Sequence, residues 1–294
     1  MKAGRWRRNG FIVAFLSPAV LLYAFFVIIP FLQTFQLSFT RFSGASSKRK
    51  FVGWENYQYL MRDEVLWTSF KNVAILLGVA GPIIFILSLL LAHAVSGDSR
   101  GAKVIRAIYL FPQIISIVAV AVLWRFIYHP TGGILKGIGI DGPQDGWLGT
   151  TSTAFWCVCV AFIWVSLGFY TMLFSAGIRS MPKEVLEACE LEGARGWKKF
   201  ANVTWPMLFS LRRVAAVYVA IHVMATFALV NVMTDGNPAD STQVPLNYMV
   251  FLMHRESDFG GASALAAMNF FVVLAVSLVV MFLFRRNPEE SRTR

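Results

Sequence analysis

The side chains best suited to chemistry in this sequence of 294 residues fall into two sets. The first is a polar stretch from residue 179 to 213, in which Glu184 and Glu187 stand three residues apart. The second consists of single polar side chains inside long apolar stretches, among them His222, which could titrate near neutral pH. The sequence holds no G-x-x-x-x-G-K-[ST] phosphate cradle and no H-E-x-x-H or C-x-x-C metal pair. The chemistry open to both sets is therefore recognition of a protein partner or of a solute.

The composition indicates that these residues belong to a membrane protein. Hydrophobic residues make up 56% of the chain and charged residues only 15%, whereas typical soluble domains carry about 25% charged residues. Three cysteines are too few for a disulfide scaffold. The balance therefore argues against a soluble globular enzyme and against a disordered chain.

Six apolar stretches are long enough to cross a bilayer as helices, for which about 20 residues are needed. Apart from Arg125, near the end of one stretch, none of them contains Lys, Arg, Asp or Glu. The predicted spans are Phe11–Leu32, Asn72–Val95, Ala107–Ile127, Ala154–Ile178, Val214–Thr234 and Ser263–Phe284. Ion-coupled carriers usually place carboxylates inside the bilayer, so the spans argue against that class.

The charges of the loops predict the orientation. The N-terminal tail, residues 96–106, residues 179–213 and the C-terminal tail hold 18 of the 27 basic residues, and the loops of the other side hold eight. The positive-inside rule therefore places both termini in the cytoplasm. The net charge of +11 is thus mostly an orientation signal, and nucleic acid is not an expected partner.

This topology divides the chain into five predicted parts. Cytoplasmic tails occupy residues 1–10 and 285–294, the first transmembrane helix occupies 11–32, and an extracytoplasmic loop occupies 33–71. The five remaining spans form a core at 72–284, which includes the cytoplasmic loop 179–213.

The cytoplasmic loop 179–213 predicts a short amphipathic helix. Ser180 is available as its N-cap, Pro182 suits its first turn, and the two glutamates complement its N-terminal dipole. Gly193 fits its end. Its apolar side is formed by Val185, Leu186, Cys189 and Leu191. A helix of this length is unstable alone in water, so it requires either a groove on a partner protein or a place among the lipid headgroups.

The same loop resembles a known motif. The letters E-A-C at 187–189, then Gly193 after three residues and V-T-W-P at 203–206 after nine more, resemble the E-A-A-x3-G-x9-I-x-L-P motif. This motif belongs to permease subunits of ATP-binding-cassette importers. The resemblance extends over nearly the whole chain. The chain is similar to the carbohydrate-uptake branch of the family, which includes maltose and glycerol-3-phosphate permeases. One segment that carries this similarity is F-V-G-W-E-N-Y at 51–57.

The resemblance implies an all-α membrane protein with six transmembrane helices, the type I importer permease fold and both termini cytoplasmic. In that family the motif forms the coupling helix, which docks in a cleft of an ATPase subunit. The residues to which this role is carried over are Glu184, Glu187, Ala188, Cys189, Leu191, Gly193 and Pro206.

The resemblance also implies the molecular surroundings of the chain. The implied partners are a second permease subunit, two ATPase subunits that bind ATP and Mg, an extracytoplasmic solute-binding protein and membrane lipid. The implied location is the cytoplasmic membrane of a bacterium or archaeon. The chain itself is expected to be non-catalytic and to bind neither a cofactor nor a metal.

Helices three to six are expected to line the solute path. Neutral hydrogen-bonding groups beside aromatic surfaces suit a sugar, although each such side chain has an alternative role in helix packing. The candidates are Gln113, Trp164, Tyr170, His222, Asn231 and Asn269. The predicted function is half of the pathway of an ATP-driven importer for a sugar or sugar-like solute. The alternative is an ATP-independent secondary carrier or channel for small polar solutes.

Overall fold

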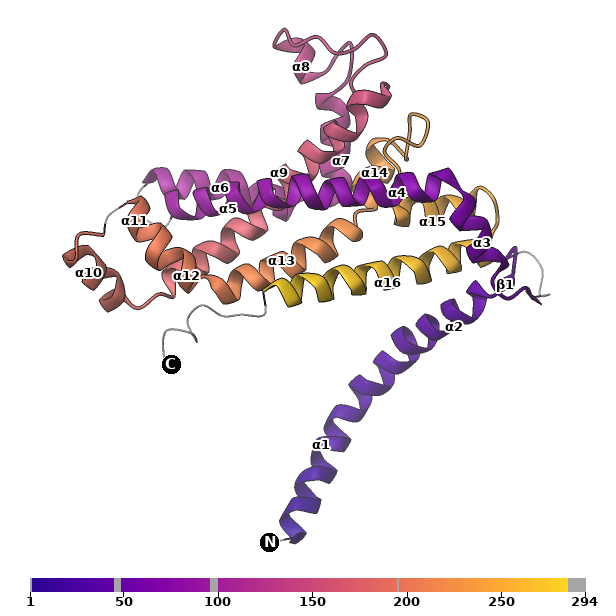
Figure 1. Cartoon of the computed structure of the whole chain (residues 1–294), viewed down its shortest axis with the longest axis horizontal. Coiled ribbons are helices and arrows are strands. Elements are labelled where there is room, and N and C mark those ends of the chain that lie inside the picture. Colours follow the sequence, from indigo (N-terminus) through magenta and orange to yellow (C-terminus); the bar gives the residue numbers. More distant parts are fainter. Residues whose placement is uncertain (1, 45–48, 96–99, 195, 285–294) are drawn as a thin grey trace. The chain divides into compact units, whose positions relative to one another are not determined.

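The computed structural model of the chain describes residues 2–44, 49–95, 100–194 and 196–284 (Figure 1). Their regular structure is helical apart from one short antiparallel pairing, in which β1 (Thr40–Arg41) meets β2 (Lys50–Phe51). The predicted C-terminal tail, residues 285–294, lies outside the described residues.

Within the described residues, four helical stretches are long and apolar enough to cross a membrane, and there are up to six if each of two bent pairs is one span. The four are Gly10–Ser38, Glu64–Ala94, Thr151–Arg179 and Phe259–Leu283. The bent pairs are Lys103–Ile114 with Ile117–Ile127, at 107°, and Trp197–Met207 with Phe209–Met224, at 71°. These six stretches overlap the six spans predicted from the sequence.

Two spans that were predicted as continuous are broken. The third is divided at Ser116, whose extended ψ of 138° separates α6 (Arg100–Ile114) from α7 (Ile117–Ile127). The fifth is divided between α13 (Phe209–Met224) and α14 (Ala228–Met233). Apolar residues continue through both breaks, so hydropathy alone cannot distinguish a broken span from a straight one.

The chain divides into two compact units. The first unit comprises Met1–Asp63 and Met249–Met268, with α1 (Lys2–Tyr23), α2 (Ile29–Ser38) and α3 (Glu55–Arg62). Its hairpin is held by Asn56, whose Nδ2 donates to the carbonyl oxygens of Ser38 (2.8 Å) and Thr40 (2.9 Å).

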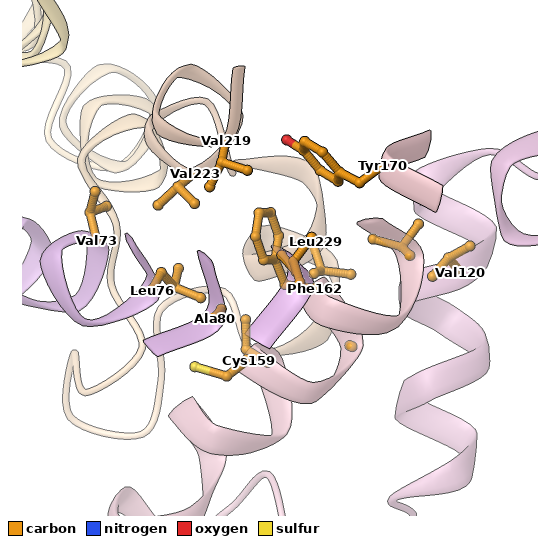
Figure 2. Packing of buried hydrophobic residues seen from close by; sticks show 14 of the residues in the cluster. Val73, Leu76, Ala80, Val120, Cys159, Phe162, Tyr170, Val219, Val223 and Leu229 are labelled. Carbon is orange, nitrogen blue, oxygen red and sulfur yellow. The ribbon is translucent and has the colours of Figure 1, made fainter. Parts of the chain in front are cut away.

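The second unit comprises Glu64–Tyr248 and Asn269–Arg294 and is built around α9 (Thr151–Arg179). Within the most apolar 18-residue window of α9, 61% of the residues are buried, and the helix packs against α5 (Gly81–Ala94), α6 and α13. Figure 2 shows Phe162 of α9 in the core cluster beside Leu229 of α14. The other helices of the second unit are α4 (Glu64–Ile75), α8 (Ile134–Gly137), α10 (Lys183–Leu191), α11 (Trp197–Lys199) and α12 (Trp205–Met207). The residues of α15 (Pro245–His254) and α16 (Phe259–Leu283) are divided between the two units.

In the part of the chain that the structure describes, three π-helical turns each precede a proline. Each has five residues, at Ala24–Ile28, Leu76–Ala80 and Phe200–Thr204, and the helix that follows carries proline in its first two positions. Proline lacks an N–H and its ring clashes with the carbonyl of the preceding turn. A wider turn before Pro30, Pro82 and Pro206 relieves that clash while the helix continues.

Candidate functional site

The two breaks in the helices border one cavity of about 310 Å³. The break between α6 and α7 contributes Gln113, and the break between α13 and α14 contributes Thr226 and Phe227. Phe162 of α9 and His222 of α13 complete the polar and aromatic part of its wall. The remaining lining residues are Pro112, Ile115, Ile117, Val165, Ala225, Ala228 and Leu229, so no described residue that lines the cavity is a carboxylate, lysine or arginine.

Close packing of α6 against α9 holds Gln113 in place. Its Nε2 donates to the carbonyl oxygen of Val165 on α9. Gly168, one turn further along α9, permits this approach, because a Cβ there would lie 2.6 Å from the carbonyl oxygen of Tyr109. The glycine thus fixes the depth at which the amide enters the cavity wall.

His222 presents its ring to the cavity between two aromatic side chains. The ring centroid lies 5.1 Å from that of Phe162 and 6.0 Å from that of Tyr218. The buried Nδ1 has no hydrogen-bond partner among the described residues. At the same break, Thr226 Oγ1 donates to the carbonyl oxygen of His222 (3.1 Å) and so satisfies a backbone acceptor where the helix ends. The site therefore offers an unused polar nitrogen beside ring faces.

The other predicted path residues do not line this cavity. Asn231 donates to Asp235 Oδ1 (3.1 Å) and Asn247 Oδ1 (3.0 Å), which gives it a structural role in the loop after α14. Trp164 packs edge to face on Trp124, with 5.8 Å between the ring centroids.

Two further path candidates are buried away from the cavity lining. Tyr170 is fully buried in the core, and Asn269 is 9% exposed. The Tyr170 hydroxyl and the Asn269 Oδ1 lack hydrogen-bond partners among the described residues. Of the six candidates, the structure thus brings Gln113 and His222 together. Their path roles, like those of the other four, stay predictions.

Sequence analysis missed Phe162, Thr226 and Phe227 as lining residues. Pro112 within an apolar stretch was the available signal, because proline inside a helix usually marks a kink or a break. The second break has no comparable marker, since residues 225–227 read Ala-Thr-Phe.

The coupling segment, residues 179–213, begins with the predicted amphipathic helix, which the structure places at α10 (Lys183–Leu191). Glu184, Glu187 and Ala188 are exposed, Cys189 is half-buried, and Leu191 is 90% exposed. An apolar side chain so exposed on a helix of nine residues indicates a surface that is completed elsewhere.

Both ends of α10 are defined by the backbone. Ser180 is not its N-cap, because the Ser180 Oγ donates to the Gly177 carbonyl oxygen (2.8 Å) and ends α9 instead. At the other end Gly193 has a φ of +81°, and the Ala194 N–H donates to the Cys189 carbonyl oxygen (2.9 Å). This is the Schellman arrangement, which favours glycine. Pro206 lies in α12, immediately before the bend into α13.

A separate polar hollow lies within the first unit. It has a volume of about 330 Å³ and is lined in part by Arg41, Glu55, Tyr59 and Asp258. Arg41 Nη2 and Glu55 Oε2 form an ion pair at 2.9 Å. The Glu256 carboxylate, with smaller effects of burial and of other carboxylates, raises the pKa of Tyr59. Burial, followed by Asp258 and Asp63, raises the pKa of Glu256.

Helical stretches long and apolar enough to cross a membrane, an internal cavity at their breaks and an exposed helix outside them are the features of a polytopic permease. Residues 84–288 match the family described as "binding-protein-dependent transport system inner membrane component". The chain belongs to this family, and the family predicted from the sequence motif is confirmed.

Relatives in several organisms resemble the chain over nearly its full length. The osmoprotective compounds uptake permease protein GgtC of Synechocystis is 31% identical and covers 90% of this chain and 95% of its own. The trehalose/maltose transport system permease protein MalF of Thermococcus litoralis is 28% identical, with 92% of each chain covered. The diacetylchitobiose uptake system permease protein NgcF of Streptomyces coelicolor is 29% identical and covers 95% of this chain and 83% of its own.

Solved structures show the same fold. A bacterial ABC transporter involved in the import of the acidic polysaccharide alginate matches with a TM-score of 0.82 and 23% identity, covering 96% of this chain and 97% of that one. The same transporter type in complex with an alginate pentasaccharide-bound periplasmic protein matches with a TM-score of 0.81 and 22% identity, covering 95% and 96%. The predicted all-α importer permease fold is thereby confirmed.

Proposed function

We propose that this chain forms half of the translocation pathway of an ATP-driven importer for a sugar or sugar-like solute. The observation that carries the proposal is that the second unit contains both an internal cavity and a separate exposed helix. A cavity with neutral polar and aromatic walls lies at the break between α6 and α7 and the break between α13 and α14. A separate helix, α10, exposes Glu187 and Leu191 on the coupling segment.

The chemistry of the cavity supports a sugar. The Gln113 amide, the His222 imidazole and the Thr226 hydroxyl offer hydrogen bonds without charge, and Phe162 and Phe227 offer ring faces. Sugar hydroxyls need such hydrogen-bonding partners, and the C–H faces of a sugar ring pack on aromatic rings. The names of relatives that carry trehalose, maltose or diacetylchitobiose point the same way.

The exposed surface of the coupling segment supports the proposal that a partner protein supplies the energy for transport. We propose that α10 docks through Glu184, Glu187, Ala188, Cys189, Leu191 and Gly193 on an ATPase subunit, with Pro206 at the base of the segment. Two ATPase subunits would hold ATP and Mg, and the hydrolysis of that ATP supplies the free energy of transport. A second permease subunit would complete the pathway, and an extracytoplasmic solute-binding protein would deliver the solute. The assembly would lie in the cytoplasmic membrane of a bacterium or archaeon.

The mechanism requires two global states whose balance depends on the nucleotide. In this proposal α10 transmits the movement of the ATPase to the bend at Trp197–Met207 and Phe209–Met224. That bend continues into His222 and the cavity wall, so a shift of α10 changes the cavity without α10 contacting the solute. This chain supplies no catalytic group to the hydrolysis.

The alternative, an ATP-independent carrier or channel, has less support. Ion-coupled carriers usually hold a carboxylate inside the bilayer, and none of the six predicted spans contains one. A channel would have no use for an exposed acidic helix that ends in a defined glycine turn.

The test is solute uptake by the complete complex in proteoliposomes with an ATP-regenerating system inside. Glu187→Lys should reduce both uptake and solute-stimulated ATP hydrolysis by about tenfold, because a reversed charge in a docking surface removes more than one kcal/mol. Glu192→Lys is the matched control, since Glu192 is also exposed but lies beyond the end of α10. Normal uptake and normal hydrolysis in Glu187→Lys would refute the coupling role. Uptake by the lone chain without ATP would favour the carrier.

A further inference from the structure

An apolar groove lies at the cytoplasmic end of the second unit and has a volume of about 410 Å³. One wall is the last part of α5, with Leu89, Leu90 and His93. The other wall follows α10 in the chain and contains Trp197, Phe200 and Trp205. The positive-inside rule predicts that the C-terminal end of α5 lies on the cytoplasmic side, so we place the groove at the depth of the cytoplasmic leaflet.

The aromatic wall is only partly covered by the rest of the chain. Trp197 stacks on Phe200, with ring centroids 5.2 Å apart, and Phe200 lies 6.2 Å from Trp205. Trp197 is nevertheless 74% exposed, and Leu90 on the opposite wall is 60% exposed. Tryptophan is enriched at the boundary between headgroups and hydrocarbon, so the groove is positioned to open towards lipid.

A buried cation adjoins this wall. The Arg212 guanidinium carbon lies 3.8 Å from the ring centroid of Trp205, and the residue is only 8% exposed. Its Nε has no hydrogen-bond partner, and no carboxylate pairs with Arg212, in the part of the chain that the structure describes. A buried charge normally has a partner of opposite sign. The Arg212 guanidinium thus packs on the rings of Trp205 and Phe209 and has no counter-ion among the described residues.

The size of the groove and its charge select the occupant. A helix is about 10–12 Å across with its side chains, so a single turn of helix would overfill this volume, whereas one hydrocarbon chain is slender enough to enter. Lys198, next to Trp197 in the chain, is exposed and adds a second cation to this segment. Basic residues at the cytoplasmic surface attract anionic lipids. An apolar slot beside unneutralised cations fits a lipid that combines an acyl chain with a negative headgroup.

We propose that this groove binds an anionic phospholipid of the cytoplasmic leaflet, with one acyl chain between α5 and the Trp197–Trp205 wall and its phosphate beside Arg212. The bound lipid would neutralise Arg212 and brace the segment between α10 and α13. The site is independent of the solute cavity, and the inference stands whatever solute the chain carries.

The probe is phosphatidylglycerol with a photoreactive acyl chain, present at low abundance in phosphatidylcholine nanodiscs that contain the complete complex. Cross-links mapped by mass spectrometry should fall within residues 86–93 and 196–205. Unlabelled phosphatidylglycerol should displace the probe, and phosphatidylcholine should displace it less well. Displacement by glycerol phosphate would identify a free phosphate site and overturn the lipid proposal. Cross-linking to a partner subunit at these residues would do the same.

Two pairs of variants separate charge from shape. Arg212→Gln should lower the labelling by phosphatidylglycerol about fivefold, as expected for one cation beside an anionic lipid, whereas Arg213→Gln should leave it unchanged. Leu90→Trp should block labelling by filling the groove, and Val214→Trp, at a similarly exposed site on α13, should not. Retained ATP hydrolysis shows that each variant is folded. Equal labelling in Arg212→Gln and the unaltered protein would overturn the role of the anionic headgroup.

Discussion

The cavity and the coupling segment differ in where their packing partners come from. The cavity wall is held from within the chain, by the contact of α6 with α9 and by the core around Phe162 (Figure 2). By contrast, α10 leaves Leu191 and its glutamates exposed. We therefore expect substitutions in the cavity wall to change folding and solute affinity, and substitutions in the coupling segment to change the coupling of transport to ATP hydrolysis.

The two glycines Gly168 and Gly193 provide the sharpest contrast. Gly168→Ala should destabilise the chain by about 1–3 kcal/mol, the range for overpacking, because the new Cβ would meet the Tyr109 carbonyl oxygen at 2.6 Å. The measurement is the temperature at which the purified complex aggregates. Gly101→Ala is the control, since nothing lies within 4 Å of that position. An unchanged aggregation temperature in Gly168→Ala would show that the crossing is looser than described.

Gly193→Val should spare folding and impair coupling. No atom lies within 4 Å of a Cβ at Gly193, but its φ of +81° is unfavourable for a β-branched residue, by about 1–2 kcal/mol. Uptake should fall about tenfold, a factor that corresponds to roughly 1.4 kcal/mol. Gly193→Asn should retain most uptake, because asparagine tolerates this conformation. Equal loss in both variants would point to the side chain rather than to the turn.

Asn231→Ala should separate structure from solute contact. It removes two hydrogen bonds, to Asp235 and Asn247, each with a net value of about 1 kcal/mol. The aggregation temperature should therefore fall while the KM for uptake stays the same. A raised KM at normal stability would restore Asn231 to the solute path.

His222→Phe should act on solute affinity alone. The His222 Nδ1 has no partner within the described residues, so its removal breaks no internal hydrogen bond there, and phenylalanine preserves the ring contact with Phe162. The KM should rise about fivefold, the value of one hydrogen bond to the solute, at normal aggregation temperature. An unaltered KM would remove His222 from the path.

Tyr170→Phe should have the smallest effect. The Tyr170 hydroxyl is buried without a hydrogen-bond partner in the described part of the chain and lies outside the cavity lining. Its loss should leave the KM unchanged and the stability equal or slightly higher. A raised KM would show that the path extends along α9 beyond the cavity.

Sequence reasoning recovered the parts of the molecule that follow from composition and short-range pattern. The apolar stretches, the amphipathic α10 and the turn at Gly193 each have a local signature. The break at Ser116 has only Pro112 as a marker, and the break at residues 225–227 has none, because the residues on both sides of each break are mostly apolar. Gln113 and His222 could be predicted for the path because they are polar residues inside apolar spans. Phe162 and Thr226, which also line the cavity, could not, because the sequence does not show where the helices break.

Local signatures also mislead where two elements compete for one residue. Ser180 has the side chain of a helix N-cap, but it lies directly after α9, whose last carbonyls also need donors. The Gly177 carbonyl oxygen accepts its hydroxyl. Asn231, a polar residue within an apolar stretch, donates to Asp235 and Asn247, and its role in the solute path stays a prediction.

The π turn at Leu76–Ala80 sets the rotational phase of everything that follows it in the same span. A helix advances about 100° per residue, so one residue more or less in that turn would swing α5 by more than a quarter of a revolution. Ile84 and Ala92, which now face inward, would turn away from α9, and other side chains would replace them. The turn before Pro82 thus fixes which side of α5 faces the core. An insertion or deletion within this span before Pro82 should be tolerated only where a second change restores the rotation of α5 about its axis.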